Sequence, residues 1–392
     1  MLLKKKWLTL LFLLVLSMVI VSCSGDETET VATIEDAVEL STVDVHRMNT
    51  IYIDQGEVFI MGENNNGQLG VGDFDAHEGA QNITSQFDLS DDDVIVQVSL
   101  GEYHAMALSQ KGMVFIWGDN TYGKLTLPDG NNESEPVNIT DNFPLDTDEM
   151  VVFIEAGRDH NGLITSEGRV FTWGANAYGQ LGNGQILNPW EGVLYQPSEI
   201  SFDLEEDDFI MDLDFGNNHS VALSNMGQAF AWGSNENNQL GFIALDTAMV
   251  HTSLAIPDLV VSDISVGYDH TAVLTTEGRL FMTGSNAFNQ LGVDEGVMSN
   301  GFIEITDAFN DEKIVGLQLG HNASSVMTED NVYVFGYNFN YQLGLETNGT
   351  VKTPTILENP AFENKKIARI FIAKEVYVIL YEDGDMAPYG PF

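Results

Sequence analysis

The sequence predicts an all-β fold, a seven-bladed β-propeller in which the two ends of the chain pair to close the ring. A short motif recurs seven times between residues 43 and 392, at intervals of 51 to 59 residues. A period of this length is typical of propellers and other repeat folds. It leaves room for about four strands of 5–6 residues with their connections. No part of residues 43–392 keeps a helical period, so we expect each repeat to be a β-sheet.

The first half of the motif is a β-hairpin that ends in a glycine after an apolar run, as in Val170-Phe171-Thr172-Trp173-Gly174. This glycine recurs at Gly62, Gly118, Gly174, Gly233, Gly284, Gly336 and Gly390. Six residues earlier stand Gly56, Gly112, Gly168, Gly227, Gly278, Asp330 and Gly384. A tight turn between two twisted strands needs a residue that tolerates positive φ, which predicts a hairpin tip at this second position.

The second half of the motif is a polar loop that follows the glycine in six copies. An asparagine stands two residues after the glycine, and asparagine side chains close turns onto their own backbone. Three residues further the copies have Gly67, Gly123, Gly179, Asn238, Asn289 and Tyr341. Glycine and asparagine both tolerate left-handed backbone, so we expect Tyr341 to be strained or rearranged. A leucine then recurs at Leu69, Leu125, Leu181, Leu240, Leu291 and Leu343, as an apolar plug.

The seven hairpins and six loops suggest how the ring closes. The chain stops at Phe392 before a seventh loop, so the first strand after the N-terminal segment is expected to complete the last blade. An open solenoid is the alternative, but it would leave sheet faces exposed at both ends.

The N-terminus has the layout of an export signal. Lys4, Lys5 and Lys6 precede an uncharged stretch from Trp7 to Val21, which at 15 residues is short for a membrane span. Ile20-Val21-Ser22-Cys23 resembles a bacterial lipobox, with Cys23 as the lipid attachment site; the alternative is an ordinary signal peptide. We therefore predict a lipoprotein signal peptide at 1–22, an acidic flexible tether at 23–42 and the propeller at 43–392, facing outside the cytoplasm at the cell surface or in the periplasm.

Composition narrows the partners. Cys23 is the single cysteine, which removes intramolecular disulfides and cysteine-based zinc sites. Without residues 1–22 the chain has 12 basic and 59 acidic residues, a formal charge of 12 − 59 = −47. Nucleic acid is excluded as a partner because phosphate binding depends on clustered Lys and Arg, and the membrane is reached through the lipid anchor only. The acidity indicates a solvated surface or a cation-binding role, and we expect a monomer.

The motifs together resemble the RCC1 (regulator of chromosome condensation) repeat. The resemblance rests on Trp173-Gly174 with Asn176, Gly179-Gln180-Leu181-Gly182 and the preceding Gly157-x-x-His160. It implies a seven-bladed propeller with strand-swapped closure. Trp117, Trp173 and Trp232 keep the family tryptophan, while Met61, Thr283, Phe335 and Tyr389 replace it.

Histidines recur in the Gly-x-x-His part of the motif, at His104, His160, His219 and His270. They occupy one equivalent position in four blades, so their side chains are not expected to converge on a metal ion. We interpret them as structural residues that hydrogen-bond backbone within or between blades. In the first copy Val45-His46-Arg47-Met48 stands in the place of this motif, and no metal or cofactor is expected.

Aromatic residues are the candidate binding surface. Tyr122, Tyr178, Phe288 and Phe339 occupy or neighbour one turn position in four repeats, and Trp190 and Tyr195 lie in the longest segment between motifs. Aromatic side chains are enriched at binding surfaces, although packing within blades is the simpler explanation.

Acidic runs precede three inner strands, at Asp91-Asp92-Asp93, at Asp146 to Glu149 and at Glu205 to Asp208. They fit solvated loops better than a cation-binding rim, and none has the spacing of an EF-hand. The chain has no Gly-x-Ser-x-Gly elbow, P-loop or dinucleotide fingerprint, and no catalytic residue is assigned.

The sequence therefore favours a non-enzymatic, lipid-anchored propeller that binds, and in one form inhibits, a protein or glycan outside the cytoplasm. The alternative is a hydrolase or lyase with acidic residues at the channel mouth. Guanine nucleotide exchange, the best-known activity of the resembling family, is disfavoured because an exported protein would not meet a nuclear GTPase.

Overall fold

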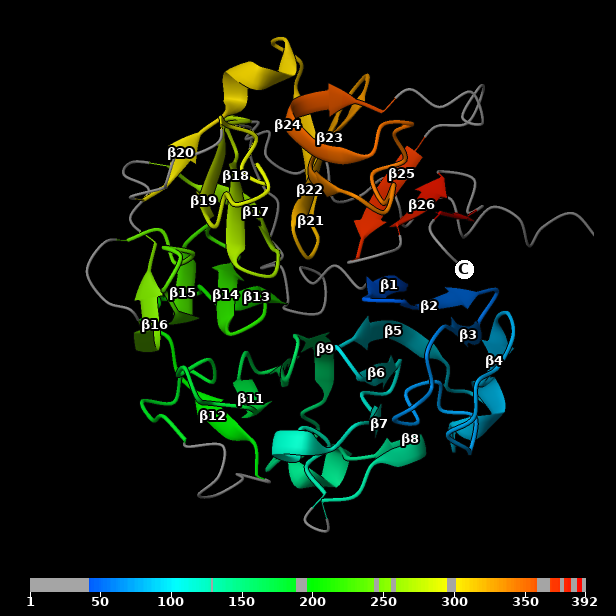
Figure 1. Cartoon of the computed structure of the whole chain (residues 1–392). Coiled ribbons are helices and arrows are strands. Elements are labelled where there is room, and N and C mark those ends of the chain that lie inside the picture. Colours follow the sequence, from blue (N-terminus) through cyan, green and yellow to red (C-terminus); the bar gives the residue numbers. More distant parts are fainter. Residues whose placement is uncertain are drawn as a thin grey trace, which may run out of the picture. The chain divides into compact units, whose positions relative to one another are not determined.

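The structure is a computed structural model. It describes residues 42–127, 130–187, 196–242, 247–254, 259–294, 301–357, 367–373, 377–381 and 386–389. The chain divides into two compact units, residues 1–33 and residues 34–392. All described residues belong to the second unit, which is an all-β propeller (Figure 1). In the described part of the chain, no helix is long and apolar enough to cross a membrane.

Six sheets are complete antiparallel blades whose strands follow one another from the innermost outward (Figure 1). Blades 1 to 3 consist of β1 (Val43–His46), β2 (Asn49–Asp54), β3 (Glu57–Met61) and β4 (Gln81–Asn82); β5 (Ile95–Leu100), β6 (His104–Ser109), β7 (Val114–Gly118) and β8 (Glu133–Asn138); β9 (Val151–Ala156), β10 (His160–Thr165), β11 (Val170–Gly174) and β12 (Ser198–Ile200). Blades 4 to 6 consist of β13 (Ile210–Phe215), β14 (His219–Ser224), β15 (Ala229–Ser234) and β16 (Thr247–Ser253); β17 (Val261–Val266), β18 (His270–Thr275), β19 (Leu280–Gly284) and β20 (Ile303–Glu304); β21 (Ile314–Leu319), β22 (Ala323–Thr328), β23 (Val332–Asn338) and β24 (Gly349–Ile356).

The last sheet has three described strands, β25 (Ile367–Ile372), β26 (Tyr377–Tyr381) and β27 (Met386–Tyr389). Short 3-10 turns lie at η1 (Thr84–Gln86), η2 (Thr121–Gly123), η3 (Thr140–Asn142) and η4 (Thr306–Phe309). Among the described residues the propeller thus has six complete blades, and the prediction of seven was wrong in this respect.

The prediction that the first strand completes the last blade was also wrong. This first described strand pairs with β2 inside blade 1, with Val45 opposite Thr50, so it takes the innermost place of its own blade. Blade 1 instead meets the last sheet through side chains: Val43 and Val45 form a buried cluster with Phe371, Ala373 and Val378. The predicted signal peptide and Cys23, like most of the tether, lie outside the described residues.

The hydrophobic cores lie between adjacent blades. Buried residues of blades 1 and 2 form one cluster, and those of blades 3 and 4 form another. Trp117, Trp173 and Trp232 are fully buried, and each indole Nε1 donates to a backbone carbonyl of the preceding blade, those of Gln68, Lys124 and Gln180, at 2.8–2.9 Å. Burying a sheet face against its neighbour supplies the apolar stabilisation that one twisted sheet lacks.

The two recurring turns have the predicted backbone. The hairpin-tip glycines have φ between +75° and +84° in blades 1 to 5, and Tyr341 has φ +58° in line with its Gly and Asn counterparts. In all six loops the motif asparagine accepts, through Oδ1, the backbone N–H of the leucine five residues later, at 2.8–3.1 Å. The predicted turn-closing role of asparagine is therefore confirmed.

Candidate functional site: the channel and its mouth

The centre of the propeller is a narrow channel of about 100 Å³, lined by the innermost strand of every sheet. One register position of these strands carries Asp44, Ser99, Glu155, Asp214, Ser265, Gln318 and Phe371. All of these except the two serines line the channel. Several of them bond forward to the next blade. Asp44 accepts the Leu100 N–H at 2.6 Å, and Asp214 accepts the Val266 N–H at 2.7 Å.

Burial raises the pKa of the channel carboxyls. The pKa of Asp44 is raised to about 6 and that of Asp214 to about 7, chiefly because burial disfavours the charged form, although backbone N–H groups oppose the shift. The pKa of Glu155 is raised well above its usual value by burial and then by Asp214 and Asp44. The channel carboxyls therefore remain protonated at pH values where solvent-exposed Asp and Glu side chains are already ionised.

One end of the channel carries both recurring turns. Each Gly-x-x-His turn joins strands one and two of a blade, and the Asn-x-x-Gly loop follows strand three. Antiparallel pairing brings these points to the same end: the Asp119 N–H donates to the Tyr103 carbonyl at 2.9 Å, and the Ala175 N–H to the Asp159 carbonyl at 2.8 Å. We call this end the mouth face. The hairpin tips and the acidic runs lie at the other end; there Asp93 accepts the Lys111 N–H at 3.2 Å and Asp208 the Met226 N–H at 3.2 Å.

The motif histidines stand beneath the mouth face and link neighbouring blades. Each is completely buried, and its Nε2 lies 2.5–3.1 Å from a side-chain oxygen of the next blade. The partners of His104, His160, His219 and His270 are Asn161, Ser220, Thr271 and Ser324. These bonds join each blade to the next through side-chain oxygens.

These histidines are neutral because burial lowers their pKa to about 3 for His104, His219 and His270 and about 4 for His160. The glycine of Gly-x-x-His leaves room for the ring: a Cβ on Gly101 would lie 1.9 Å from His104 Cε1. In blade 1 the strand register makes Asn49 the counterpart of the histidine, so the sequence alignment of Val45–Met48 with the motif was shifted by one residue. No group of three or more His, Cys, Asp or Glu in the described segments is arranged to hold a metal ion.

The residue after each motif glycine forms a ring around the mouth. Its members in blades 1 to 6 are Arg47, Glu102, Arg158, Asn217, Tyr268 and His321, and five of the six line the cavity. The sequence offered one signal for them, since this is one of the two variable places in the Gly-x-x-His turn.

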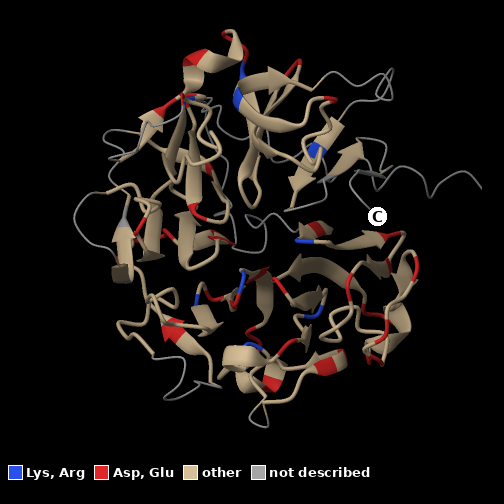
Figure 2. Ribbon diagram, viewed as in Figure 1, with Lys and Arg blue, Asp and Glu red and all other residues tan. Residues whose placement is uncertain are grey.

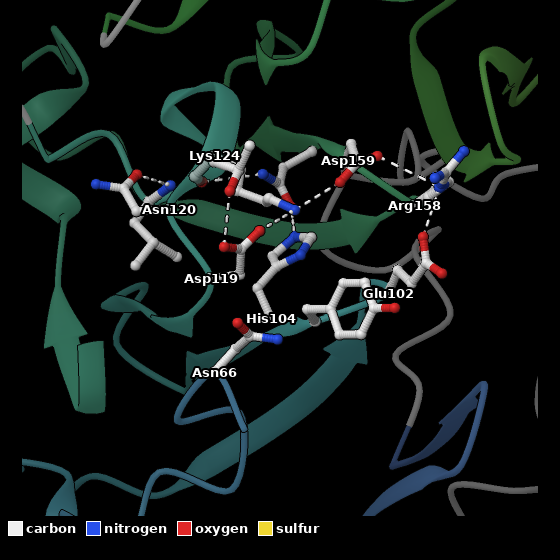
Figure 3. Close-up of polar contacts among 12 residues, drawn as sticks. Asn66, Glu102, His104, Asp119, Asn120, Lys124, Arg158 and Asp159 are labelled. Atoms are coloured by element: carbon white, nitrogen blue, oxygen red, sulfur yellow. Dashed lines mark hydrogen bonds and ion pairs between the residues drawn. The ribbon is translucent and has the colours of Figure 1, made fainter. Parts of the chain in front are cut away.

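Arg158 connects most of the ring. Its Nε donates to Glu102 Oε2 at 2.5 Å (Figure 3). Its Nη1 donates to Asn217 Oδ1 at 2.8 Å and to Tyr268 Oη at 3.1 Å. Glu102 also lies 3.5 Å from Arg47 Nη1, and the Tyr268 ring stacks on His321 with centroids 4.0 Å apart. Glu102 and nearby acidic groups hold the pKa of Arg158 above its usual value against the opposing effect of burial. The mouth is therefore a continuous polar network across six blades.

A buried ion triad underlies the charged half of the mouth (Figure 3). Lys124 has no exposed surface, and its Nζ lies 2.8 Å from Asp119 Oδ2 and 2.5 Å from Asp159 Oδ1. The other five copies have glutamine at this position, at Gln68, Gln180, Gln239, Gln290 and Gln342. Burial lowers the pKa of Lys124, but the two carboxylates outweigh it and the net shift is upward. Asp159 Oδ2 lies 3.4 Å from Arg158 Nε, which joins the triad to the ring.

The four predicted aromatic residues that the structure describes occupy the same face but do not form one continuous ring. Phe288 meets Tyr337 edge-on at 5.1 Å, and Tyr337 lies 5.1 Å from Phe339. Tyr122 and Tyr178 are half-buried in the equivalent turns of blades 2 and 3. Trp190 and Tyr195 lie outside the described residues. The structure thus brings two of the six predicted aromatics together, through Tyr337, which the sequence had not singled out.

Comparison with known proteins places this geometry among relatives. A match to the RCC1-like domain family covers residues 23–379. The Ultraviolet-B receptor UVR8 of Arabidopsis thaliana is 28% identical over 266 residues, which are 67% of this chain and 58% of the receptor. The Regulator of chromosome condensation of Mus musculus is 25% identical over 360 residues, 86% of this chain and 81% of that protein.

Among solved structures, yeast RCC1 (Prp20), crystallised with Kap60, has a TM-score of 0.72 at 21% identity, covering 84% of this chain and 77% of that one. The chain spans little more than half the length of the plant receptor, and structural likeness at this level of identity shows the fold alone.

Proposed function

Because the chain belongs to the RCC1-like domain family, we propose that it is a non-enzymatic binding module that holds another protein on its mouth face. Protein is favoured over glycan because yeast RCC1, of the same fold, was crystallised with Kap60 as its protein partner. Binding would inhibit the partner protein if the mouth face covers the partner's active site.

The observation that carries this proposal is the set of arginine and tyrosine side chains on the mouth face, in and beside the ring. Arg47, Arg158, Tyr103 and Tyr268 gather at one end of the channel, with Arg158 stacked 5.8 Å from the Tyr268 ring centroid and Arg47 5.0 Å from that of Tyr103. Arginine and tyrosine are the residue types, with tryptophan, that most often dominate binding energy at protein interfaces. The network holds them in place before a partner arrives, which lowers the entropic cost of binding.

We further propose that the protein acts outside the cytoplasm, anchored by lipid on Cys23. The basic start, the short apolar stretch and the lipobox-like Ile20 to Cys23 support this location. Two acyl chains would anchor the protein stably, since each buried methylene contributes about 0.8 kcal/mol.

The channel carboxyls are the observation that favours a second candidate, a hydrolase or lyase. Shifted pKa values in an enclosed space are common at catalytic sites. The channel volume of about 100 Å³, however, is well below the roughly 300–1,000 Å³ of usual small-molecule sites. Asp44 and Asp214 are moreover already bonded to backbone of the next blade, so a structural role for these carboxyls is favoured.

The test of the proposed function is capture of envelope proteins by the purified protein and by two matched variants. Arg158→Ala removes the centre of the mouth ring, while Arg279→Ala removes an arginine of similar exposure that pairs with Glu304 near the opposite hairpin tip. We expect a partner that wild type and Arg279→Ala retain and Arg158→Ala loses. A partner held equally by all three proteins would place binding elsewhere.

A further inference from the structure

Tyr341 is an unusual residue of the mouth face. Its backbone is left-handed, with φ +58°, at a position where the other five loops have Gly67, Gly123, Gly179, Asn238 and Asn289. A bulky side chain at positive φ is a strained arrangement, and such strain is found where surrounding structure enforces it, often at functional sites.

The surrounding turn does enforce it. Asn338 accepts the Leu343 N–H at 2.8 Å and donates to the Thr347 carbonyl at 2.6 Å, while the Tyr341 N–H donates to the Asn338 carbonyl at 3.2 Å. The loop therefore has the same conformation as its counterparts, and the tyrosine has been accommodated in it without rearrangement.

Packing does not explain this tyrosine. Its side chain is 52% exposed, and Phe339 in the same turn is 47% exposed. Phe339 continues through Tyr337 to Phe288 of blade 5, with each pair of ring centroids 5.1 Å apart. Phe288, Tyr337, Phe339 and Tyr341 together form what we call the aromatic patch.

The sequence that contains the aromatic patch has few basic residues. Lys313 is the single lysine or arginine between Arg279 and Lys352, and its Nζ is bonded to Glu329 at 3.1 Å, beside the first residue of β21 at the end of the blade away from the mouth face. The chain as a whole carries a formal charge of −44. In Figure 2 the red segments of Asp and Glu clearly exceed the blue segments of Lys and Arg. Aromatic faces attract cations, and arginine also stacks on them.

From the strained and exposed tyrosine, the contacting rings and the net negative charge of the chain, we propose that the aromatic patch binds arginine or lysine side chains of a basic segment in the partner protein. This inference rests on the proposed function and names the kind of partner. The rings supply short-range attraction, and the net charge steers a basic segment toward the protein.

The experiment measures binding of a synthetic peptide of alternating arginine and glycine to the purified protein. The citrulline analogue of the peptide keeps the shape and loses the charge, and cellohexaose serves as the glycan probe. Cation–aromatic contacts of roughly 0.5–2 kcal/mol correspond to about a 2- to 30-fold change in affinity. We expect Tyr341→Asn and Phe339→Ser each to weaken peptide binding within this range.

Phe74→Ser is the matched control, because Phe74 is 49% exposed in another blade; it should leave binding unchanged. Tyr341→Asn restores a residue that two other loops carry, so it should raise the melting temperature while it weakens binding. This separates loss of contact from loss of fold.

Three results would overturn the inference: peptide binding unaffected by Tyr341→Asn and Phe339→Ser, equal binding of the citrulline analogue, or tighter binding of cellohexaose than of the arginine peptide. The proposed function fails separately. If Arg158→Ala abolishes capture of a protein partner and Tyr341→Asn does not weaken it, the mouth ring binds and the aromatic patch does not. If the arginine peptide binds but no protein is captured, the aromatic patch stands and the proposed function falls.

Discussion

Replacing Lys124 by glutamine tests how the buried ion triad is stabilised, because the other repeats of the same chain show which residues can replace it. Five other copies have glutamine at this position, and in blade 3 the amide of Gln180 lies 3.4 Å from Asn218, the counterpart of Asp159. Lys124→Gln alone leaves Asp119 and Asp159 without the ammonium group that both of them contact.

The expected cost follows from burial. The Lys124 side chain is 0% exposed, and the Asp119 and Asp159 side chains are 12% and 14% exposed. Removing one member of such a buried group typically destabilises a protein by about 3–5 kcal/mol, since an uncompensated charge remains. Reversal of the whole triad, as Asp119→Ser, Lys124→Gln and Asp159→Asn, should be nearly neutral or stabilising, because Ser285, Gln290 and Asn322 fill the same three places in blades 5 and 6.

The assay is urea unfolding of wild type, the single variant and the triple variant, with free energies from linear extrapolation. The single variant should lose most, and the triple variant should recover to within about 1 kcal/mol of wild type. A single variant as stable as wild type, or a triple variant as weak as the single one, would refute the view that the triad is held together by charge compensation.

Three further predictions concern the channel, the motif and the surface. The pKa of Asp214 is raised to about 7 and that of Asp44 to about 6, both by burial, so the stability they contribute is present below pH 4 and is lost as pH rises through about 7. The free energy of unfolding measured in urea should therefore fall by on the order of 2–4 kcal/mol from pH 5 to pH 8. Asp214→Asn should make this pH dependence weaker. A pH dependence that the variant leaves unchanged would contradict the raised pKa of Asp214. Gly267→Ala places a Cβ 2.0 Å from His270 Cε1 and should cost about 2–3 kcal/mol, whereas Gly316→Ala, whose Cβ would lie 4.0 Å from Met327 Cβ in ordinary contact, should be tolerated; equal effects in thermal melts would argue against the ring-packing role of the motif glycine. The acidic surface should make the melting temperature rise with added salt, and a flat response up to molar salt would remove that idea.

The fold was largely predictable because its signals are local. Turn glycines, the loop asparagine and the tryptophan recur at fixed spacing, and each has a backbone or packing role that a period reveals. The number of complete blades was not predictable in the same way. It depends on whether β1 pairs with β2 or with the last sheet of the chain. That choice is made by register, and the alternation of Val43 and Val45 on β1 fits both.

The site was predictable only as a rule about where to look. Arg47, Glu102 and Arg158 each follow the first residue of the Gly-x-x-His turn or of its equivalent. The sequence around each of them does not indicate that their side chains are in contact. They meet because the blades are arranged around one channel, which brings Glu102 and Arg158, 56 residues apart, into contact. The channel carboxyls were missed for the same reason, since Asp44, Glu155 and Asp214 look like three of many acids until the strand register aligns them.

The most direct measurement of the central claim, that the mouth face holds a protein partner, is site-specific photocrosslinking in the producing cell. A photoreactive residue at position 268 would report on the mouth ring, and one at position 339 on the aromatic patch. Position 226, at the opposite hairpin tip and 49% exposed, is the control. We predict a crosslinked protein from position 268, from position 339 as well if the basic segment binds there, and none from position 226. Crosslinks from position 226 alone, or from none of the three, would contradict the claim.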